Sequence, residues 1–186
     1  MIISFGGLPG SGKSTIAKKL AEKLNWKRYY IGGIRRQKAK ERGLTLAEYN
    51  KLGETDPSTD KEVDEYQKEL GETQDNFIIE GRTSWLFIPQ SLKIFLTVDE
   101  IEGAKRIFEE CKKAEHRQDE DNNICTLEEL IESQRKRMES DRKRYKKYYN
   151  TDVFDPKPYD FVLDTTDLTP DEVFEKVYEY VKSKVS

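Results

Sequence analysis

The sequence has little of what metal-binding, secreted or membrane proteins are built from. Its one histidine, His116, and its two cysteines, Cys111 and Cys125, show no metal-ligand spacing. We therefore expect a surface histidine and two reduced thiols, as in a protein of the reducing cytoplasm. No apolar run approaches the roughly 18 residues of a membrane-spanning helix. No basic segment precedes the short apolar run at the N-terminus, so we do not expect a signal peptide.

An excess of charge of one sign is also missing. Charged residues make up 37% of the 186 residues, but the formal net charge is only −3. A solvated surface of mixed sign is not typical of proteins that bind nucleic acid or membranes. We expect neither partner, and we expect a cytoplasmic monomer. The length is enough for a single domain over residues 1–186 with one sizeable core.

A glycine-rich motif is the strongest feature that the sequence does contain. Ile2–Phe5 is predicted to be a short buried strand, and Ile16, Ala17, Leu20 and Leu24 recur at helical spacing. Between them lies a stretch that fits G-x-x-x-x-G-K-[ST], namely Gly7, Leu8, Pro9, Gly10, Ser11, Gly12, Lys13 and Ser14, followed by Thr15. A strand, a glycine loop and a helix start are the context of a P-loop.

A P-loop binds the phosphates of a nucleoside triphosphate for physical reasons. Glycines let backbone N–H groups point into one small bowl, and the following helix adds its positive end. Lys13 is expected to reach the β- and γ-phosphates, and the Ser14 hydroxyl to complete a Mg²⁺ shell. The motif therefore predicts ATP and Mg²⁺ as cofactors.

Further apolar runs alternate with helical patterns along the chain. Strands are predicted near 28–31, 76–80, 92–98 and 159–163, and Thr169 is predicted to begin a final amphipathic helix. This alternation predicts an α/β fold in which helices flank a parallel sheet. Two polar stretches, 32–75 and 111–145, are predicted as insertions at the C-terminal edge of the sheet, where such sheets bind ligands.

Several stretches together resemble the nucleoside monophosphate kinases, and in particular the short archaeal-type cytidylate kinases. They are the P-loop, "GGIRRQKAKERGLTLAEYNKLGETDPSTDKEVDEYQ", "FIIEGR", "RKRMESDRKRY" and "YDFVLDTTDLTPDEV". The resemblance runs nearly from end to end. It implies a helical monophosphate-binding region at about 32–75 and an arginine-rich lid at about 111–145. The reaction that it implies moves the ATP γ-phosphoryl group to a nucleoside monophosphate.

The resemblance also implies roles for single residues. Arg36 matches the arginine that grips the acceptor phosphate, with Arg35 beside it, although Gly33 stands where an acidic helper is common. Arg106 is expected to stack on the ATP base, with Thr165 and Thr166 near it. Arg137, Asp141 and Arg144 match the lid pattern R-x-x-x-D-x-x-R, and Arg135 is a further candidate. The stretch 116–121 fits the family poorly.

Two groups of residues are candidates on chemical grounds. Glu80 leaves a predicted core strand and could hold a Mg²⁺-bound water, Gly81 allows a close backbone approach, and Arg82 could bind the monophosphate bidentately. An ion pair between Glu80 and Arg82 is the alternative. Asp60, Asp64 and Gln67 share a helix face that could read the amino edge of cytosine, whereas Asp56 is expected to cap that helix.

These observations predict an ATP- and Mg²⁺-dependent kinase that converts CMP, and dCMP, to the diphosphate. Lys13, Arg137 and Arg144 are expected to stabilise charge, and Asp141 to orient the two arginines. Three alternatives stay open: the same chemistry on AMP, UMP or a small hydroxylated metabolite; a non-catalytic ATP sensor; and a nucleic-acid protein that uses the basic helix at 135–147.

Overall fold

A single parallel sheet forms the centre of the protein. The computed structural model describes residues 1–113 and 126–185, so His116, Cys125 and the stretch 116–121 lie outside the described residues. The strands follow the order β2-β3-β1-β4-β5. They are β1 (Ile2–Gly7), β2 (Lys27–Tyr30), β3 (Phe77–Glu80), β4 (Leu92–Thr97) and β5 (Phe161–Asp164). The predicted parallel sheet is confirmed, and each predicted strand overlaps an observed one.

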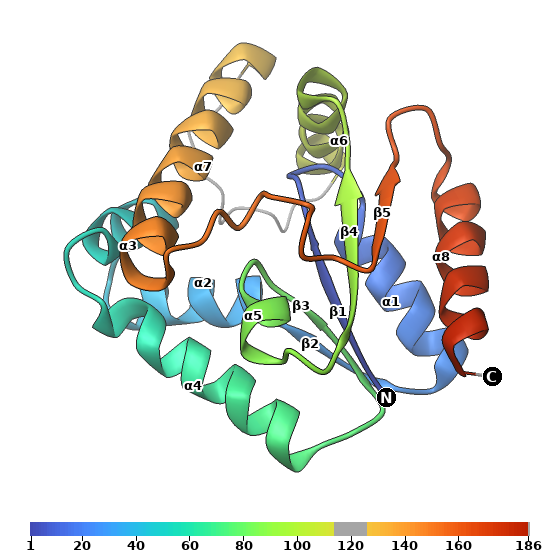
Figure 1. Cartoon of the computed structure of the whole chain (residues 1–186). Helices are drawn as coiled ribbons and strands as arrows, with labels where there is room; N and C mark the ends of the chain where they lie inside the picture. Colours follow the sequence, from blue (N-terminus) through green and yellow to red (C-terminus); the bar gives the residue numbers. More distant parts are fainter. Residues whose placement is uncertain (114–125, 186) are drawn as a thin grey trace.

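Helices connect the strands and cover both faces of the sheet (Figure 1). They are α1 (Lys13–Leu24), α2 (Ile31–Glu41), α3 (Leu46–Gly53), α4 (Ser58–Thr73), α5 (Ser84–Phe87), α6 (Glu100–Lys113), α7 (Leu127–Tyr149) and α8 (Pro170–Val185). In the part of the chain that the structure describes, no helix has both the length and the apolar character needed to cross a membrane.

The alternation of side chains along the strands divides the core into two layers. Successive residues of a strand point to opposite faces of the sheet. Ile3 therefore packs toward α1 and α8, in one cluster with Val177, whereas Ile2 packs toward α2 and α4, in a second cluster with Val63. Figure 1 shows α1 and α8 on one side of the sheet and α4 and α5 on the other. Burial on both faces explains why the central strands β1 and β3 are nearly continuous apolar runs, whereas the edge strands β2 and β5 are partly exposed.

Side-chain caps fix where the long helices begin. Thr169 and Glu172 form a capping box at the start of α8, with Pro170 as its first residue, as the sequence predicts. Thr126 caps α7 in the same way. The Asp56 carboxylate accepts a hydrogen bond from the backbone N–H of Ser58 at 2.9 Å, so it caps the first turn of α4 as expected.

The order of the strands places the site. β1 lies between β3 and β4, so the connections that leave the carboxyl ends of these strands diverge there and open a crevice. The helices α2, α3 and α7 lie at this edge, whereas α4 runs along one face of the sheet (Figure 1). Among the described residues, side chains of both polar stretches line the same cavity as the loop after β1.

Candidate active site

The loop between β1 and α1 has the geometry of a phosphate-binding loop. Gly7, Gly10 and Gly12 have φ angles of 137°, 74° and 79°, which side chains other than glycine rarely adopt. At Gly7 a Cβ atom would lie 2.2 Å from the carbonyl oxygen of Leu96, and at Gly10 it would lie 2.1 Å from that of Gly103. Gly7 and Gly10 are thus required both by the backbone conformation and by the space, and Gly12 by its backbone conformation alone.

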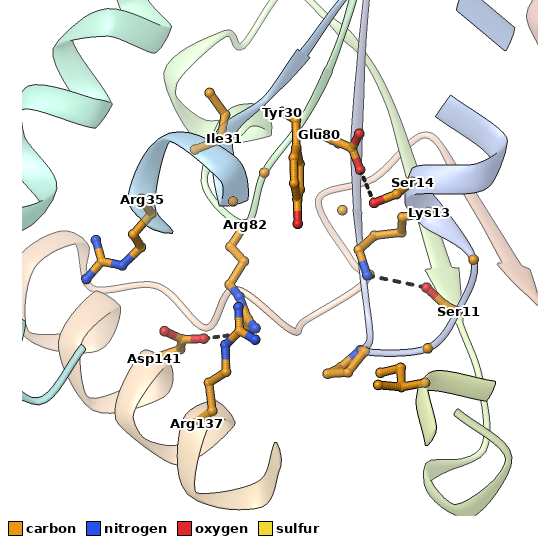
Figure 2. A pocket seen from close by; sticks show the side chains of 18 of the residues that line it. Ser11, Lys13, Ser14, Tyr30, Ile31, Arg35, Glu80, Arg82, Arg137 and Asp141 are labelled. Atoms are coloured by element: carbon orange, nitrogen blue, oxygen red, sulfur yellow. Dashed lines mark hydrogen bonds and ion pairs between the residues drawn. The ribbon is translucent and has the colours of Figure 1, made fainter. Parts of the chain in front are cut away.

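Lys13 lies at the centre of a group of cations. Its Nζ atom donates to the carbonyl oxygen of Leu8 at 2.6 Å. Burial, together with the neighbouring Arg82 and Arg137, lowers the pKa of Lys13 to about 7, while Glu80 opposes this shift. Figure 2 shows Lys13, Arg82 and Arg137 directed into the same space. Several positive groups that converge in this way form a binding site for an anion with several charges.

Ser14 and Glu80 form a pair of oxygen ligands beside the loop. The Ser14 hydroxyl donates to Glu80 Oε2 at 2.6 Å, and the Glu80 side chain is only 3% exposed (Figure 2). Arg28 on β2 holds the other oxygen of Glu80. Hydroxyl and carboxylate oxygens are ligands that Mg²⁺ prefers, so these residues fit a magnesium site. The alternative ion pair between Glu80 and Arg82 is wrong, because Glu80 pairs with Arg28 and Arg82 with Asp141.

A cavity of about 500 Å³ extends from the loop toward α4 and α7. The P-loop forms one wall, and α2, α4 and α7 form the opposite walls. Its positive side chains are Lys13, Arg35, Arg36, Arg82, Arg106, Arg137 and Arg144. This concentration of positive charge suits two phosphorylated molecules that meet in one enclosed space.

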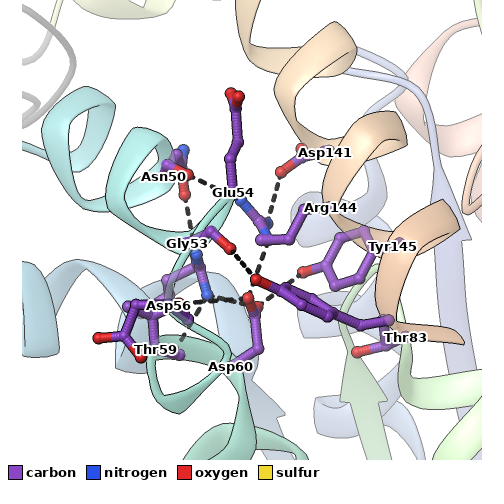
Figure 3. Close-up of polar contacts among 12 residues, drawn as sticks. Asn50, Gly53, Glu54, Asp56, Thr59, Asp60, Thr83, Asp141, Arg144 and Tyr145 are labelled. Carbon is purple, nitrogen blue, oxygen red and sulfur yellow. Dashed lines mark hydrogen bonds and ion pairs between the residues drawn. The ribbon is translucent and has the colours of Figure 1, made fainter.

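A chain of buried ion pairs crosses the far wall of the cavity (Figure 3). Arg82 lies 2.6 Å from Asp141, Asp141 lies 2.7 Å from Arg144, and Arg144 lies 2.9 Å from Asp60. Asp60 also pairs with Arg35 at 2.6 Å. Burial opposes the ionisation of Asp141, but Arg82, Arg144 and Arg137 outweigh it and hold its pKa below the usual value. The charges alternate in sign, so each buried charge has a partner.

The arginines of α7 divide into different environments. Arg137 lines the cavity beside Arg82 (Figure 2). Arg144 is 1% exposed, and Asp60 and Asp141 hold it, so its guanidinium belongs to the ion-pair chain. Arg135 does not line the cavity and forms an exposed bidentate pair with Glu100 on α6. Arg135, the further candidate, is therefore engaged outside the cavity in this structure.

The three residues of the predicted base-reading face of α4 differ in their partners and in whether they line the cavity. Asp60 lines the cavity, but its two oxygens are paired with Arg35 and Arg144. Asp64 lines the cavity and is 5% exposed. Gln67 is fully buried behind Asp64 and does not line the cavity. Its amide donates to Asp64 and accepts from Ser84. Among the three, Asp64 alone lines the cavity with a carboxylate whose hydrogen-bond partners among the described residues are neutral groups.

The presence of glycine at position 33 has a steric explanation in this chain. Tyr30 lies at the end of β2 with its ring against the first turn of α2, and it lines the cavity (Figure 2). A Cβ atom at Gly32 or at Gly33 would lie 2.9 Å from that ring. Arg36 donates to the Tyr30 hydroxyl and lies over the ring. The tyrosine thus occupies the space beside Arg36 that a side chain at position 33 would need.

Arg106 is fixed at the mouth of the P-loop. Its guanidinium donates to the carbonyl oxygens of Thr165 and Thr166 at 2.9 and 2.7 Å, and Glu102 accepts from its Nε atom. The Thr165 hydroxyl donates to Ser11 in the loop at 3.3 Å. Arg106 and Thr165 line the cavity, whereas Thr166 does not. A guanidinium held in one plane is suited to stacking on a base.

Sequence reasoning missed several residues that build this site: Arg28, Tyr30, Asn50, Thr83, Tyr145 and Tyr149. Tyr149, for example, reaches Asp64 across a separation of 85 positions. A partner that far along the chain leaves no periodic signal. For Arg28 a weak signal exists, because it lies on a strand predicted next to the site.

The fold and the cavity define a P-loop kinase. A family model described as "Cytidylate kinase-like family" matches residues 2–167, and the chain belongs to this family. It is 35% identical to a cytidylate kinase from Methanocorpusculum labreanum, over 98% of this chain and 97% of that protein. It is 38% identical to a cytidylate kinase from Methanocaldococcus jannaschii, over 94% of this chain and 93% of that protein. The family resemblance of the sequence is confirmed.

Solved structures share the fold at low identity. An uncharacterised protein from Eubacterium ventriosum has a TM-score of 0.70 and 18% identity, over 98% of this chain and 99% of that one. A shikimate kinase from Bacteroides thetaiotaomicron has a TM-score of 0.65 and 15% identity, over 98% of each chain. These similarities confirm the P-loop kinase fold.

Proposed function

We propose that this protein transfers the γ-phosphoryl group of ATP to CMP, and to dCMP, and releases the diphosphate. The observation that carries the proposal is the single cavity that joins Lys13 of the P-loop to Arg82 and Arg137 and ends at Asp64. The names of the archaeal relatives support the choice of acceptor, and membership of the family supports ATP as donor.

Transfer between two phosphates needs alignment, charge stabilisation and exclusion of water. The backbone N–H groups of Gly7–Thr15 cradle the ATP phosphates. Arg36 and Arg82 hold the acceptor phosphate, and Lys13 and Arg137 neutralise the charge that develops between the two nucleotides. At Gly81 a Cβ atom would lie 2.5 Å from the Ser84 hydroxyl, so only glycine allows the chain to bring Arg82 to this position.

Mg²⁺ is the metal that this site suits. Ser14 would hold it directly and Glu80 through a water, since both present oxygens beside the loop. When bound, Mg²⁺ neutralises phosphate charge and keeps the phosphates in line for transfer. Arg28 fixes the orientation of Glu80 through the oxygen that faces away from Ser14.

We assign the two polar regions to the two nucleotides. Residues 32–75 bind the monophosphate through Arg36 and Asp64, and residues 111–145 form the lid through Arg137. In this assignment Asp141, Arg144 and Asp60 act mainly by holding Arg82 and Arg35 in place, because their charged groups are engaged in the ion-pair chain. The expectations of a cytoplasmic monomer without nucleic-acid or membrane partners stay predictions.

The test is ADP release from ATP and Mg²⁺ with CMP, dCMP, UMP, AMP, GMP or buffer alone. We expect fast turnover with CMP and dCMP, and slow turnover with the other acceptors. Preference for AMP or UMP would keep the kinase and contradict the assigned acceptor. Tight ATP binding without release of ADP in any sample would contradict the enzyme and indicate an ATP-sensing module.

A further inference from the structure

Asp64 is enclosed by hydrogen-bond donors at the end of the cavity away from the P-loop. Its Oδ1 atom accepts from the Gln67 amide at 3.2 Å and from the Thr83 hydroxyl at 3.4 Å. Its Oδ2 atom accepts from the Tyr149 hydroxyl. Donors on both sides orient the carboxylate, so it can meet a ligand in only one way.

Tyr149 belongs to a different element and does not line the cavity. It is the last residue of α7. Its ring stacks on Tyr145 at 6.0 Å with an interplanar angle of 24°, and it meets the Phe87 ring edge-on at 5.3 Å. Tyr148 also meets it edge-on at 6.4 Å, and these aromatic neighbours hold the ring, so the hydroxyl stays aimed at Asp64. Any effect of Tyr149 on a ligand must pass through that carboxylate.

The protonation of Asp64 decides which base it can accept. An ionised carboxylate only accepts hydrogen bonds, whereas a protonated one also donates. Cytosine presents an N4 amino donor where uracil presents an oxo acceptor. An ionised Asp64 therefore pairs with the amino group of cytosine and repels the oxo group of uracil. A protonated Asp64 could donate to the oxo group and would accept both bases.

We propose that Tyr149 is a positioning residue that favours the ionised form of Asp64, which only accepts hydrogen bonds, and that it thereby strengthens the preference for cytosine over uracil. This inference rests on the proposed function, because it specifies how the acceptor base is chosen. If it holds, the C-terminal end of α7 takes part in recognising the base of the acceptor.

The electrostatic surroundings agree with this role. The pKa of Asp64 is raised to about 7, because burial and the charge of Asp60 on α4 outweigh the opposing effects of the hydrogen bonds from Tyr149 on α7 and Thr83 and of the charge of Arg35 on α2. The group therefore titrates near neutral pH. Loss of the Tyr149 hydroxyl would move its pKa higher, so that more of the protein would carry a protonated Asp64 at pH 7.

The test compares Tyr149→Phe with Tyr148→Phe, which is a matched control. Tyr148 lies next to it in the last turn of α7, but its hydroxyl donates to the Gly53 carbonyl oxygen at 2.9 Å, and the residue does not line the cavity. The measurement is kcat/KM for CMP and for UMP at several pH values from 6 to 9. In the wild type we expect the CMP-to-UMP ratio to rise with pH around 7.

In Tyr149→Phe we expect that ratio to fall about tenfold at pH 7.5, as loss of a hydrogen bond to a charged group implies. We also expect the rise of the ratio to move to higher pH, while KM for ATP and the ratio in Tyr148→Phe stay unchanged. Asp64→Asn, whose amide both donates and accepts at every pH, should lose the pH dependence of the ratio, which keeps the test decisive if Tyr149→Phe does not fold.

Two results would overturn the inference while leaving the kinase intact. One is an unchanged ratio and pH profile in Tyr149→Phe or, if that variant does not fold, in Asp64→Asn. The other is an equal loss of selectivity in Tyr148→Phe. If the wild-type protein phosphorylates neither CMP nor UMP, the proposed function itself fails and the inference falls with it.

Discussion

At the scale of the residue, the surroundings of Lys13 favour the binding of a polyanion. Its ammonium group shares the cavity with Arg82 and Arg137, and its pKa is about 7. A buried cation among other cations is costly, and a bound phosphate chain would remove that cost. The same arrangement that disfavours the charged amine in the protein alone therefore favours the binding of ATP.

This environment predicts that the binding of ATP depends on pH. Below pH 7 the Lys13 amine is already charged, so pH has little effect through this group. Above pH 7 the unbound protein loses the proton and the complex keeps it, so binding takes up a proton. We expect the Kd for ATP to rise by up to about tenfold per pH unit above 7. Calorimetry at pH 8 in buffers of different ionisation enthalpy measures the uptake. Equal proton uptake in the wild type and in Lys13→Ala would contradict this account.

At the scale of the element, α7 is attached to the monophosphate-binding helices along its C-terminal half. Arg144 reaches Asp60 on α4, and Tyr148 and Lys147 donate to the carbonyl oxygens of Gly53 and Glu54 at the end of α3. The N-terminal half of α7 instead meets α6 through Arg135 and Glu100. The helix thus connects the acceptor side of the cavity with the donor side.

The ion-pair chain predicts a large difference between two carboxylates of α4. Asp60→Asn leaves buried Arg35 and Arg144 without a full charge partner, and loss of one member of a buried pair costs about 3–5 kcal/mol. Glu62→Gln breaks an exposed pair with Lys38 that water screens, so we expect a much smaller loss of stability. Urea unfolding measures both free energies. Equal destabilisation by the two substitutions would contradict the claim that Asp60 stabilises the fold through its buried ion pairs.

Elements were predictable from the sequence wherever their signal is local. The strand at Ile2, the glycine loop and the helix that starts at Thr169 each follow from neighbouring residues. The pair between Asp141 and Arg144 agrees with their spacing of three on one helix, as the sequence predicted. The partners of Asp60 and the pair between Asp141 and Arg82 were not predictable, because ion pairs between different elements leave no spacing pattern. Spacing did place Asp60, Asp64 and Gln67 on one helix face. Only the tertiary structure shows that Gln67 lies behind Asp64.

At the scale of the whole molecule, the order of the strands explains why distant motifs meet. The P-loop leaves β1, Glu80 and Arg82 leave β3, and Thr165 follows β5, so the parallel sheet delivers all of them to one edge. Helix α7 closes the space from the opposite side (Figure 1). The position of the site was therefore predictable from the fold class, whereas the division of its arginines into ligand-facing and structural groups was not.

The measurement that tests the central claim most directly follows the label from γ-³²P-ATP. The account predicts that label appears in CDP when CMP is present, and in dCDP when dCMP is present. It also predicts that Lys13→Ala slows this transfer at least about 100-fold, while Lys18→Ala, an exposed lysine of the same helix, does not. Label that appears only in inorganic phosphate, at the same rate with and without CMP, would contradict the claim.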